Sequence, residues 1–158
     1  HPESVAAHSW RLALLAYFVA DEYPDADMNK VIRMCLIHDL GECFIGDIPS
    51  FKKTDADEET EKKQLLGWVD TLPEPYRAEM TALYREMLAL KSTEARIYKA
   101  LDNMEAVIQH NESDLSSWEE NEYTLNFTYG EDKAAFSPYL AALRRAVRDE
   151  PEKKIEQR

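Results

Sequence analysis

The chain has 158 residues, 44% of them apolar and 32% charged, which is enough to bury a core and excludes a disordered chain. Its formal net charge of −12 argues against a nucleic-acid polymer as partner, because such a partner requires a basic surface. No apolar run is long enough to span a membrane, and no signal peptide is visible.

The scarcity of glycine, with only 4 residues, suits an all-helical chain better than a turn-rich sheet protein. The two cysteines, Cys35 and Cys43, stand in apolar contexts, and their spacing is not that of a metal knuckle. We therefore interpret them as reduced thiols of an intracellular protein. We expect one all-α domain of about six helices over residues 1–150, followed by an exposed tail over residues 151–158.

The first predicted helix runs from about Glu3 to about Glu22. His8 falls on the same inward stripe as Leu12 and Leu15, which recur at helical spacing. A single histidine on such a stripe is more often a satisfied core residue than a metal ligand. His8 therefore needs partners elsewhere in the chain before it indicates a site.

A second helix is predicted from about Met28 to Leu40, with Asp27 as its N-cap. His38 and Asp39 stand at its C-terminal end, after a buried apolar stretch. A neighbouring imidazole and carboxylate are good ligands for one divalent metal ion. Taken alone, such a pair is more often the polar end of an ordinary helix than a metal site.

A turn-rich loop follows from Glu42 to Phe51, and its position directly after the His-Asp pair makes it a candidate for function. Asp47 in this loop is explained equally well as a turn former. Lys52 and Lys53 form a small positive spot in an acidic chain, and a solvated loop is the simpler interpretation of them.

Further helices are predicted over residues 54–70, 76–90 and 93–110, and a last one starts near Ser137 and ends at Pro151. Asp102 borders the apolar stripe of the helix over 93–110. A carboxylate there is paired with a cation, bound to a metal ion or placed at the edge of solvent. Glu105, one turn further along, is expected to be its exposed neighbour.

Three helices thus each offer a metal-competent side chain on or beside a buried face: His8, then His38 with Asp39, then Asp102. Two imidazoles and two carboxylates suit Mn, Co, Fe, Ni or Zn better than Ca. Four protein ligands leave open positions in an octahedral shell for water and a substrate oxygen. Such an ion lowers the pKa of bound water to about 7.

The order H…HD…D of these four residues resembles the signature of the HD-domain metal-dependent phosphohydrolases. A closer similarity, to the branch of 5′-deoxynucleotidases and their relatives, extends over PESVAAHSWRLALLA, LIHDLGECFIGDIP and KALDNMEAVIQH, within residues 2–110. The resemblance implies an HD-domain helical bundle around one divalent metal ion, held by His8, His38, Asp39 and Asp102. Mg²⁺ is also compatible with this site.

The resemblance also implies roles for residues of the loop. Glu42 matches the carboxylate of HDxGE that orients or deprotonates the attacking water, and Asp47 in GDIP matches a second active-site acid. The implied reaction is hydrolysis of a nucleoside 5′-monophosphate, with deoxynucleotides favoured, to nucleoside and phosphate. Members of the family are typically cytoplasmic homodimers that act on small-molecule nucleotides, without a membrane or nucleic-acid partner.

Two features depart from the family pattern. Ala7 stands where relatives usually have an acidic residue before the histidine. Relatives also have a helix before PESVA that lends an arginine to the substrate phosphate, and this sequence begins after it, which leaves Lys52 or Lys53 as the candidate phosphate contact. Two alternatives follow: hydrolysis of a nucleoside triphosphate or other phosphate ester at the same site, or a non-catalytic module that binds metal or nucleotide.

Overall fold

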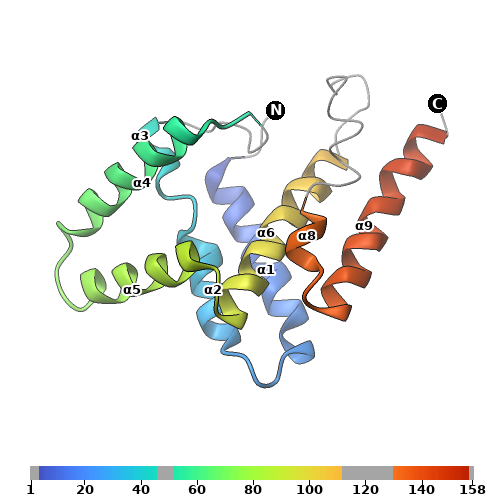
Figure 1. Cartoon of the computed structure of the whole chain (residues 1–158), viewed down its shortest axis with the longest axis horizontal. Coiled ribbons are helices and arrows are strands. Elements are labelled where there is room, and N and C mark those ends of the chain that lie inside the picture. The colour runs from blue at the N-terminus through green and yellow to red at the C-terminus, as the bar shows by residue number, and fades with distance from the viewer. Residues whose placement is uncertain (1–3, 46–51, 112–129, 157–158) are drawn as a thin grey trace.

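The computed structural model describes residues 4–45, 52–111 and 130–156, and within these ranges all regular secondary structure is helical (Figure 1). The long helices are α1 (Val5–Val19), α2 (Met28–Ile37), α4 (Asp55–Val69), α5 (Tyr76–Ala89), α6 (Thr93–Asn111) and α9 (Pro138–Glu156). The short elements are η1 (Ala20–Glu22), α3 (Glu42–Ile45) and α8 (Glu131–Ala134). The predicted all-α bundle is confirmed. None of the described helices is both long enough and apolar enough to cross a bilayer.

Local capping explains where several helices begin. The Ser4 side chain accepts a hydrogen bond from the backbone of α1, and Asp27 does the same for α2. Thr54 and Asp57 form a reciprocal capping box at the start of α4. These contacts lie within three residues in sequence, so they can be recognised from the chain alone, and the predicted Asp27 cap of α2 is confirmed.

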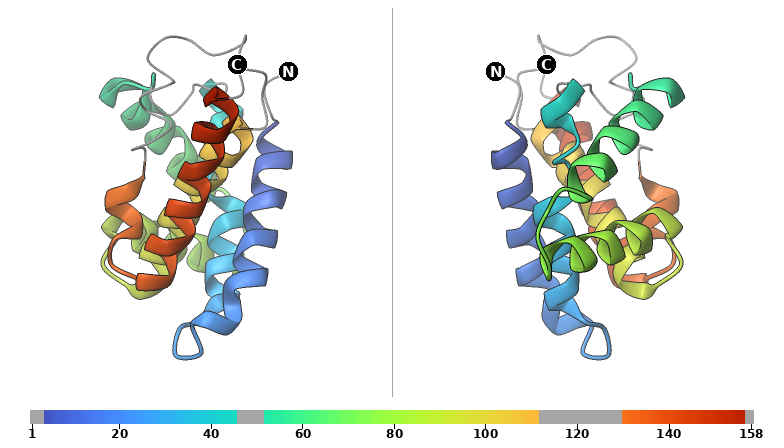
Figure 2. Two further views of the ribbon diagram at one scale, coloured as in Figure 1. Left: turned by 90° about the vertical axis from the view of Figure 1, so that its right-hand side faces the viewer. Right: turned by 90° about the vertical axis from the view of Figure 1, so that its left-hand side faces the viewer.

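The core lies between α1, α2 and α6, which pack against one another along their apolar stripes. Side chains from all three helices are completely buried: Leu12, Ala16, Val31, Met34, Cys35, Ile97, Leu101 and Met104. Helix α9 covers one side of this trio, and α4 with α5 extend on the opposite side (Figure 2). The packing of these three helices therefore determines which of their polar side chains come together.

The chain leaves α2 earlier than the sequence predicts. Helix α2 ends at Ile37 and not at Leu40, because tight turns with hydrogen bonds between residues three apart follow as far as Phe44. Gly41 permits the close approach of α4 here, since a Cβ atom on it would lie 2.6 Å from Cγ of Glu61. His38 and Asp39 consequently lie on the turn after α2.

Two further differences concern the loop and the last helix. Residues 42–45 form a helical turn instead of belonging to a loop. Helix α9 continues past Pro151 to Glu156, because a proline removes one backbone hydrogen bond while its fixed φ remains compatible with a helix. Residues 112–129 lie outside the ranges that the structure describes.

Gly130 and Gly67 provide a matched test of the backbone. Gly130 has a φ of 80°, and a Cβ atom there would lie 2.5 Å from Cβ of Asn103. We expect Gly130→Ala to lower the free energy of unfolding by roughly 1–3 kcal/mol. Gly67→Ala, in α4 with open space around the new methyl group, should raise it by roughly 0.5–1 kcal/mol. Urea unfolding measures both free energies, and equal effects of the two substitutions would contradict the different backbone environments of Gly130 and Gly67.

Candidate metal centre

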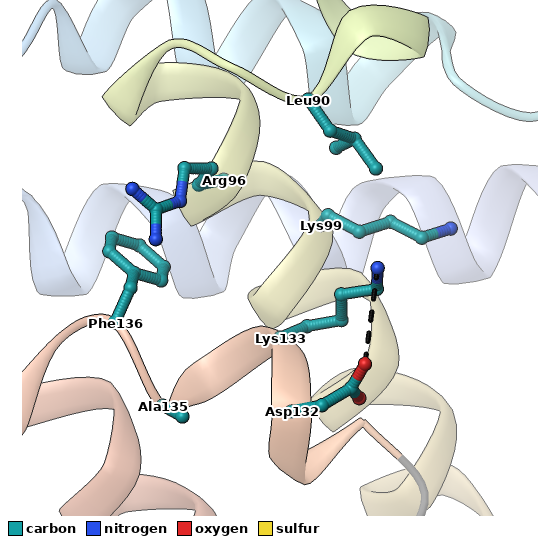
Figure 3. A pocket seen from close by; sticks show the side chains of 7 residues that line it. All are labelled: Leu90, Arg96, Lys99, Asp132, Lys133, Ala135 and Phe136. Carbon is teal, nitrogen blue, oxygen red and sulfur yellow. Dashed lines mark ion pairs between the residues drawn. The ribbon is translucent and has the colours of Figure 1, made fainter.

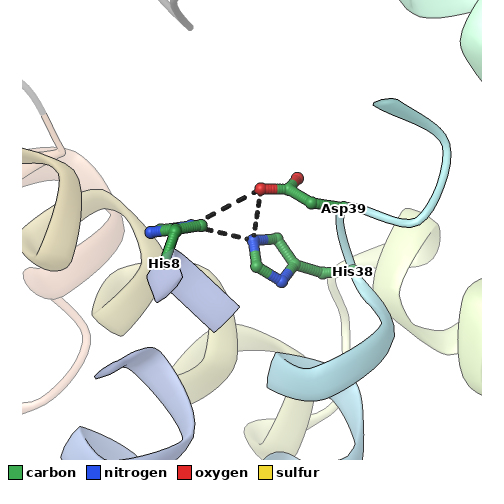
Figure 4. A group of neighbouring side chains, drawn as sticks. All are labelled: His8, His38 and Asp39. Carbon is green, nitrogen blue, oxygen red and sulfur yellow. Dashed lines mark hydrogen bonds and ion pairs between the residues drawn. The ribbon is translucent and has the colours of Figure 1, made fainter. Parts of the chain in front are cut away.

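Four predicted ligand residues come together where α1, α2 and α6 meet. His8 lies in the second turn of α1, His38 is the C-cap of α2 and Asp39 follows it. Asp102 lies in the middle of α6. Figure 4 shows His8 on α1 pointing toward His38 and Asp39, which lie on the turn after α2. Their ligand atoms all lie within 4.8 Å of one another.

The distances between these groups are short and similar. Nε2 of His8 lies 3.0 Å from Nε2 of His38, 3.0 Å from Oδ1 of Asp102 and 3.5 Å from Oδ2 of Asp39. Nε2 of His38 lies 3.0 Å from Oδ2 of Asp39 and 3.2 Å from Oδ1 of Asp102. The His38 side chain is only 2% exposed, and the other three are 15–21% exposed. The cluster is therefore largely removed from water, with one partly open side.

This spacing fits a single divalent ion. Bonds from zinc-like metals to nitrogen or oxygen are about 2.0–2.2 Å long, so two ligands lie about 3.0 Å apart at a right angle and about 3.4 Å apart at the tetrahedral angle. The distances of 3.0 to 3.5 Å between these atoms fall in that range. Two imidazole nitrogens with two carboxylate oxygens also form a donor set that suits first-row divalent metals.

Both imidazoles are held with the same nitrogen facing the centre. Nδ1 of His38 donates to the backbone carbonyl of Cys35 at 2.7 Å, and Nδ1 of His8 donates to the Glu105 carboxylate. A carbonyl oxygen and an ionised carboxylate can only accept, so Nδ1 carries the hydrogen in each ring. The Nε2 atoms are thereby left for a ligand role, which is how metal-binding histidines are commonly oriented.

The sequence interpretation of Glu105 was wrong. We expected it to be exposed, but it is 2% exposed and contacts His8, with its second oxygen 3.4 Å from Nε of Arg11. A signal for this position does exist, because residues three apart on a helix share a face and Asp102 precedes Glu105 by three. The partner on α1 lies 97 residues away in sequence, which no local pattern can identify.

The carboxylates hold protons on the two imidazoles. Burial alone would lower the pKa of His8, but hydrogen bonds to Asp102 and Glu105 outweigh it and raise that pKa to about 10. Burial also opposes the shift in His38, yet the charges of Asp102 and Asp39 raise its pKa well above the usual value. For Asp102, burial alone would raise the pKa, but the charge of His38 outweighs burial and holds this pKa well below its usual range. With their Nε2 atoms 3.0 Å apart, the rings titrate as a pair.

Glu42 and Lys53 lie together next to these charges. Glu42 opens α3 and is 9% exposed, and its Oε1 lies 3.7 Å from Nζ of Lys53. That ammonium also donates to Glu61 at 2.8 Å. Burial would lower the pKa of Lys53, but the hydrogen bond to Glu61 and the charges of Glu61, Glu42 and Asp39 raise it. Lys53 is therefore charged and within the electrostatic field of Asp39.

The other two residues predicted from the loop are placed differently. Lys52 is exposed on the turn before α4, whereas the Lys53 side chain is 12% exposed. Asp47 falls within residues 46–51, outside the ranges that the structure describes. The structure thus describes the positions of Glu42 and Lys53, whereas the role of Asp47 stays a prediction.

We expect the metal-free protein to lose stability as the pH rises from 6.5 to about 10. A raised pKa means that the folded state holds its imidazole proton more tightly than the unfolded chain does. This contribution is complete below 6.5 and is lost as the folded protein deprotonates near 10. Urea unfolding of metal-stripped protein measures it. Asp102→Asn should show a smaller decline, and an equal decline would assign the effect to other groups.

Comparison with known proteins gives matches over most of the chain. The family model described as "HD domain" matches residues 1–144. Human 5′-deoxynucleotidase HDDC2 is 33% identical over 113 residues, which cover 70% of this chain and 54% of the human protein. The dATP triphosphohydrolase of cyanophage S-2L is 32% identical over 111 residues, covering 68% of this chain and 57% of the phage protein. The chain therefore spans about half the length of the curated relatives that it matches.

A solved structure agrees with this relationship. The crystal structure of a predicted metal-dependent phosphohydrolase from Magnetospirillum magnetotacticum MS-1 aligns with a TM-score of 0.77 at 30% sequence identity. The alignment covers 98% of this chain and 80% of that protein. The family resemblance predicted from the order of His8, His38, Asp39 and Asp102 is thus confirmed by sequence and by fold. The chain belongs to the HD-domain family.

Proposed function

We propose that the protein is a metal-dependent phosphohydrolase that cleaves (deoxy)nucleoside 5′-monophosphates into nucleoside and phosphate. The observation that carries this proposal is that two imidazole Nε2 atoms lie 3.0 Å apart and each lies 3.0 to 3.5 Å from oxygens of both Asp39 and Asp102. Relatives named 5′-deoxynucleotidase support the monophosphate as substrate. The alternative, a non-catalytic module that binds metal or nucleotide, has no comparable support from the names of these relatives.

His8, His38, Asp39 and Asp102 would hold one divalent ion, of Mn, Co, Fe, Ni or Zn, with Mg also compatible. When bound, this ion supplies an acidified water molecule and polarises a phosphoryl oxygen. The protein's contribution is to keep both Nε2 atoms facing inward through the Nδ1 contacts to Cys35 and Glu105. It also confines the charged groups to a site largely shielded from solvent, where their interactions are strong.

Glu42 is the proposed base. Its carboxylate is almost completely buried, and its Oε1 lies 3.7 Å from the Lys53 ammonium. In the proposed reaction, water attacks phosphorus, its proton passes to Glu42, and the bond between phosphorus and the 5′ oxygen breaks. Asp47 is the proposed second acid, which would position the water or protonate the leaving oxygen.

Lys53 is the better candidate of the two lysines for contact with the substrate phosphate. It is charged, close to Glu42 and held by Glu61, whereas Lys52 is exposed. A phosphate that reached this ammonium would find a cation already oriented by a hydrogen bond, which lowers the entropic cost of binding. Lys52 is retained in the proposal as an exposed contact at the edge of the site.

We propose that the protein forms a homodimer through α1. Trp10, Tyr17 and Phe18 on this helix are 63%, 65% and 76% exposed, and Val5–Val19 contains no acidic residue. Two copies can therefore meet here without carboxylates of α1 facing one another. Together they would cover roughly 800–1,000 Å², close to the lower limit for a specific interface. Sedimentation equilibrium tests this, and a monomer at high concentration would refute it.

We place the protein in the cytoplasm on the basis of the family resemblance and its free cysteines.

Metal-stripped protein resupplied with Mn²⁺, Co²⁺, Zn²⁺ or Mg²⁺ should release orthophosphate from deoxynucleoside 5′-monophosphates. Asp39→Ala should abolish release, because it removes a ligand of the proposed ion. The measurement is orthophosphate release from a panel of deoxy- and ribonucleoside monophosphates. Full activity in Asp39→Ala would overturn the proposal.

The cyanophage relative favours a second substrate class, the nucleoside triphosphates, at the same centre. The product separates the two readily: release of tripolyphosphate from dATP identifies a triphosphohydrolase, and orthophosphate from a monophosphate identifies a nucleotidase. Silence on both panels, from protein that still binds metal, would favour the non-catalytic alternative.

Glu105 and Glu42 should have separable effects. Glu105→Gln weakens the contact that orients His8, and we expect metal affinity to fall by roughly 10–100-fold. Glu42→Gln should leave metal affinity unchanged and lower turnover by roughly 100-fold or more, because it removes the proposed base. Metal titration and steady-state kinetics on both variants measure these effects. Normal turnover in Glu42→Gln would exclude its role as base.

A further inference from the structure

A second polar cavity lies between α6 and α8, outside the proposed metal centre. It has a volume of about 470 Å³, within the range of small-ligand sites. Three cations line it, together with one carboxylate and apolar side chains: Arg96, Lys99, Lys133, Asp132, Leu90 and Phe136. Arg96 and Phe136 lie at one end of this α6–α8 groove, and the ammonium groups of Lys99 and Lys133 point into the other (Figure 3).

The cations of the α6–α8 groove are only weakly compensated. The Lys133 ammonium is 4.0 Å from Asp132, both on exposed side chains, so water screens this pair. The Arg96 guanidinium is stacked on the Phe136 ring at 4.3 Å from its centroid, and no carboxylate in the described ranges lies within ion-pair distance of it. In a chain of net charge −12, this groove is a local concentration of positive charge.

Lys99 connects the groove to the metal centre. Its Nζ lies 3.6 Å from Oδ2 of Asp102, and the other oxygen of the same carboxylate contacts Nε2 of His8 and of His38. A cation on Asp102 competes with any ion held by that carboxylate. An anion in the groove would share the charge of Lys99 and so reduce this competition.

We propose that the α6–α8 groove binds a small phosphate-bearing polyanion, and that its occupation strengthens metal binding at the centre. Arg96 and Lys133 would contact the phosphate groups by charge-assisted hydrogen bonds, and Lys99 would turn toward them from Asp102. Linkage requires the reverse effect too, so a bound metal ion strengthens anion binding. The binding step is independent of the proposed hydrolase activity, while the coupling step rests on the proposed metal centre.

Calorimetry on metal-stripped protein tests the binding step with orthophosphate, pyrophosphate and ADP. We expect Arg96→Gln/Lys133→Gln to bind pyrophosphate at least about tenfold more weakly than the wild type, because two charged contacts are lost. The control Lys62→Gln/Lys63→Gln makes the same change in net charge on the exposed face of α4 and should bind normally. Tighter binding of ADP than of pyrophosphate would identify a nucleotide as the ligand, and equal binding a polyphosphate.

Lys133→Gln alone keeps the test valid if loss of the Arg96 stack disturbs folding, since the Lys133 side chain is 43% exposed. It should also weaken pyrophosphate binding. Wild-type affinity in both groove variants, or no binding to the wild type, overturns the proposal.

The coupling step is tested with Mn²⁺ and sulfate, an anion that chelates Mn²⁺ weakly. Free Mn²⁺ is measured by electron paramagnetic resonance at constant ionic strength. Sulfate should increase Mn²⁺ affinity in the wild type and in Lys62→Gln/Lys63→Gln, and less in Arg96→Gln/Lys133→Gln. The same increase in all three proteins would place the anion at the metal centre itself and refute the coupling.

Discussion

The packing of α1, α2 and α6 against one another brings three carboxyl groups and two imidazoles into one small volume that is largely removed from water. Asp39, Asp102 and Glu105 are costly to bury as anions unless cations face them. Protonated imidazoles supply this charge in the metal-free protein, and a divalent ion would supply more. The packing of apolar side chains along α1, α2 and α6 must therefore outweigh an electrostatic cost that depends on what the centre holds.

Each histidine is fixed by a different kind of acceptor. His38 is held by the carbonyl of Cys35, three residues earlier on its own helix, so its orientation follows from the end of α2. His8 is held by Glu105 on another helix, so its orientation depends on how α1 packs against α6. The orientation of His38 is thus determined locally, whereas the orientation of His8 depends on the tertiary structure.

The sequence reveals those parts of the molecule that depend on local spacing. Helical periodicity predicts the long helices, and the caps at Asp27 and at Thr54 with Asp57 mark two of their starts. The order of His8, His38-Asp39 and Asp102 indicates the family. What periodicity misses depends on contacts between distant segments, such as Glu105 with His8, or on short turns such as α3 and α8, whose few residues leave no period.

The same limit explains why Lys53 looked like a solvated loop residue. Its burial results from Glu61, which α4 brings over Gly41, and from Glu42 on the turn after α2. No pattern around a pair of lysines indicates that one faces inward and the other outward. Once both flanking segments are placed, the geometry distinguishes Lys53 from Lys52 directly.

Partial compensation of charge around the centre is the last consequence of this packing. Arg11 faces Glu105 at 3.4 Å, Lys53 faces Glu42 at 3.7 Å, and Lys99 faces Asp102 at 3.6 Å. These cations come from α1, from the segment before α4 and from α6, so each carboxylate is neutralised by a different part of the chain. A protein of net charge −12 repels a phosphate dianion at long range. Under the proposed function, this set of cations would reduce that repulsion for a phosphate substrate, and none of the three would occupy the Nε2 atoms that face the proposed metal position.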